Sequence, residues 1–338
     1  SALFRSSSNG YTTSGATTVT VNITQSQSYY YVETVINTAL DPIIAQIVYS
    51  GPLNIGAKSI ARVLKQPIFA DGQALYAMSP SQKNAIEFTG DADMEVTGTG
   101  IFSNSSHGTN SISFGGSSTT YVDGYVRSVG GVNAAGTVLN PDDSPFTDFN
   151  AVGQNSPPYV PTPECSLLSA GSRTTSGGEV YFTPGRYANI TENGHTTYHF
   201  APGFYCITGA FTTTNGEFEG EDVSFYVETG NVSLGGNVTF SAADNGLMLG
   251  KQNWNGMLLH VAQGRLTING NADSDYIGTV YVPTPANPSC KLNGSSDSEG
   301  FSMQLVCDSI NINGTGQLII NYDQSNIYKA PVIVDLFE

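Results

Sequence analysis

The acidic residues are the first candidates for chemistry, because paired carboxylates carry out acid and base steps in many enzymes. Asp142-Asp143 and Glu221-Asp222 are the adjacent acidic pairs of the chain. Hydrolysis of a sugar polymer needs two carboxyl groups at a set separation, and lyase chemistry needs a cationic base beside acidic calcium ligands. Asp142-Asp143 lies in a Pro-rich stretch typical of a solvated loop, and the 12 Lys and Arg residues do not recur beside an acidic cluster. The sequence therefore predicts no catalytic residues and a protein that is not an enzyme.

Oxygen ligands alternate at Asn271, Asp273 and Asp275, which makes this loop a weak calcium candidate. A calcium-binding loop also needs a glycine for its tight turn and a later bidentate acid. Gly278 and the distant Glu299 are poor substitutes for these. An Asx-rich turn explains the loop better, so we expect no metal.

His195 and His199 are four residues apart, which places both on one face of a strand. Neither a third ligand nor a second Cys of a CxxC pair lies nearby in the sequence, so a zinc site is not expected. The chain also lacks a G-x-S-x-G nucleophile elbow and a phosphate-binding Gly-rich loop. We therefore predict no cofactor.

Asn-x-Ser/Thr sequons mark positions where a secreted glycoprotein could carry glycans. In a chain so rich in Asn, Ser and Thr, chance accounts for most of them. The seven candidates are Asn22, Asn104, Asn189, Asn231, Asn237, Asn293 and Asn313.

Composition places the protein among extracellular β proteins. Only 12% of its 338 residues are charged, 38 are Gly, and 18 Tyr and 16 Phe supply material for a core. The net charge of −16 removes any electrostatic basis for binding nucleic acid or anionic lipid. Carbohydrate stays open as a partner, since runs such as Tyr29-Tyr30-Tyr31 could form a sugar-binding platform, although aromatic residues on strands more often pack across a sheet.

Four cysteines, an even number, favour disulfides in such a chain. Three pairings are possible, and we favour Cys165–Cys206 with Cys290–Cys307. Residues 290 and 307 are 17 apart on what look like neighbouring turns of chain, where a strand spacing of about 4.8 Å permits a bridge. Four reduced, buried thiols are the alternative.

Short apolar runs end repeatedly in Asn-Gly, a dipeptide that turns the chain without strain. The clearest are Ile268-Asn269-Gly270, Leu292-Asn293-Gly294 and Ile312-Asn313-Gly314, at intervals of 24 and 20 residues. Phe88-Thr89-Gly90 and Val96-Thr97-Gly98 repeat the pattern with Thr. Intervals of this size are roughly one turn of a β-solenoid.

The fold class predicted from these patterns is mainly β, with a small α+β module (β-β-α-β) followed by a β-solenoid or β-helix-like domain. Its segments are a polar N-terminal arm at 1–15, the module at 16–66, a connector at 67–84, the β-solenoid-like domain at 85–323 with a Pro-rich excursion at 131–178, and an apolar C-terminal strand at 324–338.

Two segments of this plan carry specific expectations. Asp41 and Pro42 predict the start of a helix that Gly51 ends. The apolar tail either closes a sheet of its own chain, which we favour, or adds a strand to a neighbouring subunit. The first residues resemble neither a signal peptide nor a membrane span, so we expect a processed mature chain or a trimmed ectodomain.

Several of these stretches resemble the TadE/TadG-like family of tight-adherence pilus assembly. The first part is similar to the region that follows the membrane helix in that family, and the later part to the Gly-rich β-repeat ectodomain of its bacterial members. Members of the family carry an N-terminal hydrophobic helix that attaches them to the membrane. These residues contain no counterpart of that helix, so we expect membrane attachment only through such an additional segment. The matching stretches are Asn9-Gly10-Tyr11, TTVTVNI, YVETVI, DPIIAQIVYSG, IGAKSIARV, IEFTGDADMEVTGTGIFSNSS, FTPGRY, FAPGFYCITGAF, IGTVYVP and VCDSININGTGQLIINYD.

The resemblance implies a role at the cell surface in pilus assembly or adhesion. We therefore expect a non-enzymatic structural or adhesive protein whose partners are further copies of itself or other pilus and surface subunits. A surface protein that binds or degrades carbohydrate is the leading alternative. A self-assembling filament subunit is the third possibility.

Overall fold

The structure is a computed structural model in which the chain divides into two compact units. Unit 1 comprises residues 1–67 and 331–338, and unit 2 comprises residues 68–330. Each unit is described by itself. The described residues are 15–25, 29–40, 52–64, 68–91, 93–117, 119–244, 247–250, 252–270, 273–294, 301–314, 317–330 and 334–337.

The fold is mainly β, as predicted. The described residues form strands and two short 3-10 turns, η2 (Phe69–Gly72) and η3 (Cys165–Leu167), and none of them forms an α-helix. The helix predicted from Asp41 to Gly51 and most of the predicted arm at 1–15 lie outside the described residues. Among the described residues no helix has the length and apolar character that crossing a membrane requires.

Unit 1 is an antiparallel sheet of four strands in the order β1-β2-β3-β34. In β1 the β-branched residues Val19, Val21 and Ile23 alternate with Thr and Asn, as a strand period of two requires. The C-terminal strand pairs within its own chain, with Leu336 opposite Ala61, so it joins the N-terminal strands. The strands are β1 (Thr17–Gln25), β2 (Tyr29–Leu40), β3 (Leu53–Leu64) and β34 (Val334–Phe337).

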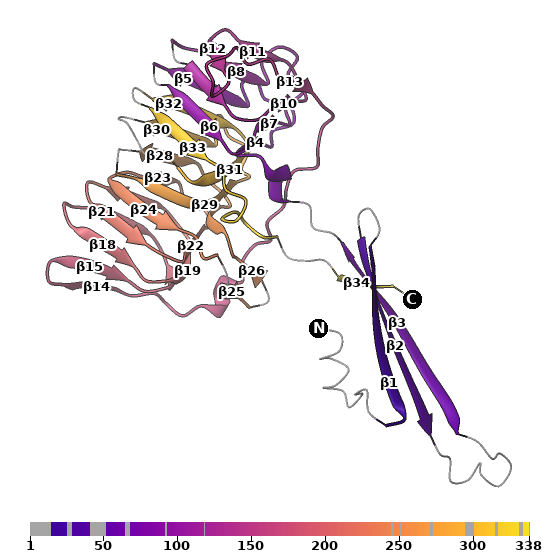
Figure 1. Ribbon diagram of the computed structural model, residues 1–338. Coiled ribbons are helices and arrows are strands. Elements are labelled where there is room, and N and C mark those ends of the chain that lie inside the picture. The colour runs from indigo at the N-terminus through magenta and orange to yellow at the C-terminus, as the bar shows by residue number, and fades with distance from the viewer. Residues whose placement is uncertain are drawn as a thin grey trace. The chain divides into compact units, whose positions relative to one another are not determined.

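Unit 2 is a stack of short strands that pair mostly in parallel (Figure 1). The nine-stranded sheet has the order β11 (Val132–Ala134), β8 (Ile112–Phe114), β5 (Ile86–Gly90), β32 (Ile310–Gly314), β30 (Cys290–Gly294), β28 (Leu266–Gly270), β23 (Val232–Leu234), β20 (Phe211–Thr214) and β17 (Ile190–Asn193). A four-stranded sheet has the order β12 (Thr137–Leu139), β9 (Thr119–Val122), β6 (Met94–Thr97) and β33 (Leu318–Asn321).

The remaining strands form a 15-stranded sheet that divides at β29, and a separate pair. One path is β13 (Phe149–Ala151), β10 (Val126–Ser128), β7 (Ile101–Ser103), β4 (Leu75–Ala77), β31 (Met303–Cys307), β29 (Asp275–Val282), β24 (Asn237–Ser241), β21 (Glu217–Gly220), β18 (Thr197–Phe200), β15 (Glu179–Phe182) and β14 (Arg173–Ser176). The branch is β27 (Met257–Val261), β22 (Val223–Val227), β19 (Gly203–Ile207) and β16 (Gly185–Tyr187), and the pair is β25 (Met248–Leu249) with β26 (Gln252–Asn253).

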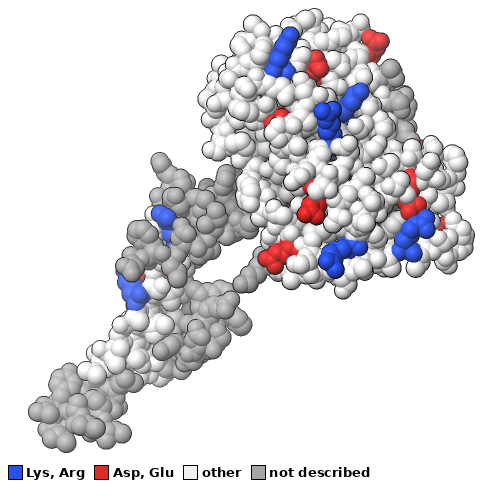
Figure 2. All heavy atoms as spheres, turned by 180° about the vertical axis from the view of Figure 1, so that it is seen from behind, with Lys and Arg blue, Asp and Glu red and all other residues white. Residues whose placement is uncertain are grey.

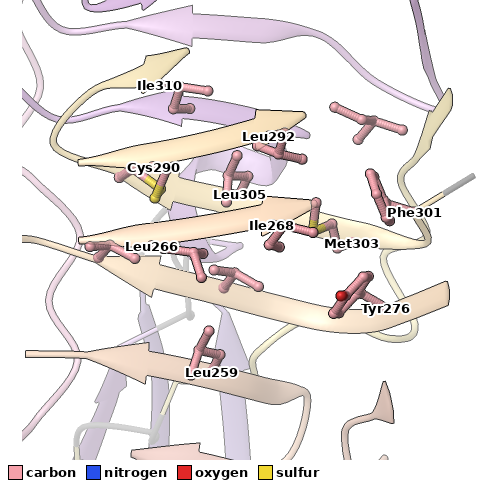
Figure 3. Packing of buried hydrophobic residues seen from close by; sticks show 14 of the residues in the cluster. Leu259, Leu266, Ile268, Tyr276, Cys290, Leu292, Phe301, Met303, Leu305 and Ile310 are labelled. Atoms are coloured by element: carbon pink, nitrogen blue, oxygen red, sulfur yellow. A yellow bond between two sulfur atoms is a disulfide. The ribbon is translucent and has the colours of Figure 1, made fainter. Parts of the chain in front are cut away.

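Identical positions stack on one another along the nine-stranded sheet. The glycines that end the Asn-Gly and Thr-Gly triplets pair as Gly270, Gly294, Gly314 and Gly90 on neighbouring strands. Inward side chains stack in the same way, with ring centroids 4.8 Å apart for Phe88 and Phe114. Figure 3 shows part of the resulting core, to which the nine-stranded, four-stranded and 15-stranded sheets all contribute side chains. Each fully buried side chain of this size stabilises the fold by about 1.5–3 kcal/mol.

The stack is built from two stretches of chain that meet along a seam, which we define as the pairs β4–β31, β5–β32 and β6–β33. Residues 68–151 build one end and residues 172–322 build the other. Gln304 is fully buried at the seam, where its Nε2 donates to the carbonyl oxygens of Phe69 (3.1 Å) and Gln73 (2.9 Å). The side chain thus holds two segments together that are more than 200 residues apart.

The boundaries within unit 2 differ from those predicted. The connector predicted at 67–84 contains β4, a buried strand of the 15-stranded sheet. The Pro-rich excursion predicted at 131–178 contains β11, β12, β13 and β14, whose backbones pair with their neighbours in the sheets. Residues 152–168, which we call the strap, form a long stretch of this segment without a strand. Short strands of three or four residues leave too weak a sequence pattern to be recognised among Pro and Gly.

The strap connects the two ends of the stack and covers part of the 15-stranded sheet. Tyr281 donates its hydroxyl hydrogen to the carbonyl of Pro158 (3.0 Å), and Gln252 Nε2 donates to the carbonyl of Thr162 (2.7 Å). A disulfide joins Cys165 of the strap to Cys206 of β19, with Cα atoms 6.0 Å apart. The second disulfide joins Cys290 to Cys307, with Cα atoms 6.2 Å apart. This is the pairing favoured from the sequence.

Candidate functional site

One face of the 15-stranded sheet is lined by polar side chains that project away from the core. We call it the open face, formed by β15, β18, β21, β24 and the start of β29. Along each of these strands buried and outward residues alternate, as in Glu217-Phe218-Glu219-Gly220. Backbone register therefore arranges the outward residues in two columns, which are Glu179, Thr197, Glu217, Asn237 and Asp273 in one, and Tyr181, His199, Glu219, Thr239 and Asp275 in the other.

His199 lies between two carboxylates on neighbouring strands. Its Nε2 is 3.2 Å from Glu179 Oε2, and its Nδ1 is 3.2 Å from Glu219 Oε2. Tyr181 stacks on the imidazole with ring centroids 4.8 Å apart and donates its hydroxyl hydrogen to Glu179 (2.6 Å). The hydrogen bond from Tyr181, and secondly that from His199, lower the pKa of the Glu179 carboxyl. The open face thus carries an ordered network of charged and aromatic side chains.

Two shallow hollows flank this network. The first has a volume of about 500 Å³, and its lining includes His199, Pro202, Glu219, Thr239 and Asp275. The second has a volume of about 510 Å³, and its lining includes His195, Thr197, Glu217 and Asn237. Each hollow therefore follows one of the two columns across β18, β21 and β24. Both have the size of a small-ligand site, but they are open to solvent, whereas most ligand pockets bury their ligand.

Asp275 differs from the other acids of the open face because it is half-buried. Burial raises the pKa of its carboxyl, although the Ser302 N–H donates to Oδ1 over 3.4 Å. Glu219 lies two strands away, with Thr239 of β24 between them. Two strand spacings are about 9.6 Å. Inverting glycosidases hold their carboxyl groups about 6.5–9.5 Å apart, and the backbones of this pair are spaced just beyond that range.

The two described residues of the weak calcium candidate, Asp273 and Asp275, each bond to a different neighbour. Asn271 lies outside the described residues, Asp273 Oδ2 accepts a hydrogen bond from Asn237 Nδ2 (3.4 Å), and Asp275 is bonded to Ser302. Within the described ranges, His, Cys, Asp and Glu side chains nowhere gather in threes as a metal site requires. No acid lies directly beside another acid along either column, so carboxylates of neighbouring strands within a column are kept apart.

The sequon asparagines lie in different surroundings. Asn104 is 2% exposed, its Nδ2 donates to the carbonyl of Asn155 (2.9 Å), and its Oδ1 accepts from the Asn155 N–H (2.8 Å), so a glycan does not fit there in this fold. Asn22 donates to Glu33, Asn189 accepts from the Ala210 N–H, and Asn231 accepts from the Arg265 N–H. Asn237 lies on the open face, and Asn293 and Asn313 pair on adjacent strands.

Sequence reasoning missed most of the open face. It singled out His195, His199, Asp273 and Asp275 separately, and the structure brings all four to the same face of the sheet. It did not find Tyr181 or the glutamates of β15 and β21. The sequence signal for these residues was the alternation along each strand, which shows which side chains point outward. Which outward side chains become neighbours depends on the register between strands, and a single sequence does not reveal that register.

Charge is sparse elsewhere. Figure 2 shows one face of the molecule, on which charged side chains are few and form no large patch of one sign. Nucleic-acid binding needs clustered Lys and Arg, and the face in Figure 2 shows no large cluster of them. The open face, with its hydrogen-bonding columns, is therefore the better candidate for binding a polar ligand.

No protein-family model matches the chain, and neither a curated protein nor a solved structure matches it. The resemblance to TadE/TadG-like proteins therefore remains a prediction from the sequence.

Proposed function

We propose that unit 2 is a β-solenoid and that the chain is an extracellular structural or adhesive protein. In this proposal it is a pilus-associated subunit or part of a surface filament, and it has no enzymatic activity. Its partners would be further copies of the chain or other surface subunits, in line with the resemblance to TadE/TadG-like proteins.

The observation that carries the proposal is the stack itself. Parallel strands pair position by position from β11 to β17, and each turn of chain contacts only its neighbours, as in repeat proteins that serve as scaffolds. Two disulfides, one of which fastens the strap, indicate an oxidising environment. A chain stabilised in this way resists unfolding outside the cell, where a structural protein has to persist.

Immunogold electron microscopy of intact source cells tests this function. Antibodies against the purified chain should label the cell surface or fibres that extend from it. Peptide mapping of the native protein without reduction should recover Cys165 linked to Cys206. Label confined to the cell interior, together with reduced cysteines, would contradict the proposal.

Carbohydrate binding or degradation is the second candidate, and the open face favours it. Its hollows combine carboxylates, amides and hydroxyls, and Asp275 has a raised pKa while Glu219 is exposed, as an acid and a base would require. The test is release of reducing sugars from a panel of polysaccharides. Release that is lost in Glu219→Gln and in Asp275→Asn, but retained in the control Glu228→Gln, would establish an enzyme. No release with any polysaccharide would leave the structural function standing.

A further inference from the structure

A third polar pocket lies away from the open face, where the turn η2, the strands β7 and β10, and the strap meet. Its volume is about 250 Å³. Asp71 and Gln73 come from the turn η2 and the residue after it, Arg127 comes from β10, and Asn155 comes from the strap. Phe102 of β7 and Val152 supply the apolar part of the lining. The pocket exists only because the strap closes over the turn and the sheet.

The turn that supplies Asp71 has a left-handed backbone. Ala70, Asp71 and Gly72 have φ of 49°, 53° and 69°. Such a conformation costs a residue with a side chain roughly 1–2 kcal/mol, and consecutive residues of this kind are rare. Hydrogen bonds from the Asp71 N–H to the Ile68 carbonyl and from the Gln73 N–H to the Ala70 carbonyl, both 3.0 Å, hold it.

This turn directs the Asp71 carboxylate toward the strap. There Asp71 Oδ2 accepts a hydrogen bond of 2.7 Å from Asn155 Nδ2. The strap is itself fixed at this point, because Asn155 exchanges two hydrogen bonds with the buried Asn104. Asp71 therefore keeps its second carboxylate oxygen, Oδ1, as an acceptor at the pocket, while the Asn155 side chain also bonds to Tyr76.

Gln73 contributes a buried polar atom without a partner. The residue is 1% exposed, and its Nε2 donates to the Asp71 carbonyl (3.2 Å) and to the Tyr125 hydroxyl (2.7 Å). Its Oε1 has no hydrogen-bond partner among the described residues. A buried acceptor left in this state costs about 1–3 kcal/mol. The atom is enclosed by protein, so Gln73 holds the turn against Tyr125 and does not itself offer this oxygen to a ligand.

Arg127 provides the donors. Its guanidinium carbon lies 3.8 Å from the centroid of the Tyr125 ring, which holds the planar group in place while the residue stays exposed. Its five N–H donors, arranged in a planar fork, thus line the same pocket as the Asp71 carboxylate. Planar donor and acceptor groups beside an apolar lining match a ring whose edge carries hydroxyls and whose faces carry C–H groups.

We propose that this pocket binds one neutral sugar ring, as a free monosaccharide or as the end of a glycan. The small volume limits the ligand to one ring, and the carboxylate of Asp71 together with the net charge of −16 disfavours an anionic ligand. The inference goes beyond the proposed structural function, which requires no small ligand, and it concerns different residues from those of the open face.

Ligand-observed NMR and titration calorimetry with the full chain test the inference. The probes are D-glucose, D-galactose, D-mannose and N-acetyl-D-glucosamine, with D-glucuronic acid as the anionic comparison. At least one neutral sugar should bind with a millimolar or lower Kd. Arg127→Gln and Asp71→Asn should each weaken that binding about ten-fold, the loss of one hydrogen bond to a charged group. Asn suits the left-handed conformation of residue 71, so the second variant retains the turn.

Arg265→Gln is the matched control, since it removes an exposed arginine elsewhere in unit 2 and should leave the Kd unchanged. No binding by any of the four neutral sugars would overturn the inference. Preference for glucuronic acid would overturn the neutral ligand class. Binding that survives Arg127→Gln and Asp71→Asn but is lost in Glu219→Gln would place the sugar on the open face instead. None of these results bears on the immunogold experiment, so the two proposals can fail separately.

Discussion

Two histidines show how differently the two branches of the 15-stranded sheet are exposed to solvent. One branch continues from β29 to β24, β21 and β18, and the other from β29 to β27, β22 and β19. His199 of β18 lies on the open face, a third of its side chain exposed, between two carboxylates. His260 of β27 is 3% exposed, with the rings of Tyr226, Tyr281 and Trp254 at 5.1, 5.0 and 6.2 Å. We call this second side the covered face, because the strap and the residues around Trp254 pack on it.

The difference lies in what packs on the strands rather than in their pairing. On the open face every second residue is polar, as in TYHF of β18 and EFEG of β21. On the covered face VSFYV of β22 and MLLHV of β27 are buried throughout, since a second apolar cluster lies outside the sheet. Strands buried on both faces read as continuous apolar runs. The covered face therefore adds to the apolar core, whereas the open face leaves its outward side chains in contact with solvent.

The largest expected effect is on the covered face, at Trp254. This residue is fully buried, with its ring centroid 4.9 Å from that of Phe204. Trp254→Ala should lower the free energy of unfolding by about 3–5 kcal/mol, because it leaves a cavity under the strap. Urea unfolding followed by circular dichroism measures this, since Trp254 is the one tryptophan of the chain and its fluorescence is lost with it.

Tyr181→Ala is the matched aromatic change on the open face. Tyr181 is 39% exposed, so its loss should cost below about 1 kcal/mol. If Trp254→Ala and Tyr181→Ala lower the free energy of unfolding equally, the strap does not stabilise the covered face. The contrast between the two faces would then be wrong.

The part of the fold that the sequence predicted depends on local signals. Strand-length apolar runs ending in Asn-Gly or Thr-Gly predicted short strands, and four of the five glycines, Gly90, Gly270, Gly294 and Gly314, pair at the ends of neighbouring strands. Cys290 and Cys307 could be paired because they are 17 residues apart, on what look like neighbouring turns of chain. Turn chemistry acts within a few residues, so it is visible in the sequence.

The part that could not be predicted depends on contacts between distant segments. Nothing local indicates that β4 pairs with β31 or that Gln304 bonds to Phe69 and Gln73. The pocket at Asp71 has the same origin, because its residues come from the turn, β10 and the strap. An outward residue such as Glu219 is recognisable as outward, but its neighbours are set by register.

His260 gives the next largest effect, and it depends on pH. Burial lowers the pKa of its imidazole from 6.5 to about 3. Between these values the unfolded chain binds a proton at His260 that the folded chain does not, so this residue makes stability fall as the pH falls. From pH 7 to pH 5 the loss is about 2 kcal/mol, at 1.36 kcal/mol per pKa unit. His260→Phe should remove that loss, measured as a smaller shift of the urea midpoint between the two pH values.

His195→Gln is the control, because His195 is exposed and should leave the pH dependence as it is in the unmodified chain. The difference between variant and unmodified chain isolates His260 from Asp275 and Asp308, whose pKa values burial raises and whose contribution has the opposite sign. An unchanged pH dependence in His260→Phe would show that the imidazole is hydrated, and hence that the covered face is open to water.

The smallest effect is on the open face and concerns the pKa of Glu179. The hydrogen bond from Tyr181 lowers this pKa most, and that from His199 comes second. Tyr181→Phe should therefore raise the Glu179 pKa more than His199→Gln does, as followed by the carboxyl carbon signal in an NMR titration. A carboxyl group whose pKa is lowered in the folded protein stabilises the fold at pH values above its ordinary pKa of 4.5. This stabilisation is lost as the pH falls through the lowered pKa of the folded protein, so both variants should lose stability only at neutral pH. Glu179 is exposed to solvent, so neither loss should move the urea midpoint beyond measurement error. If His199→Gln has the larger effect on the Glu179 pKa, the network is organised by charge rather than by the tyrosine hydroxyl, and a cationic group rather than a sugar hydroxyl is the better partner for this face.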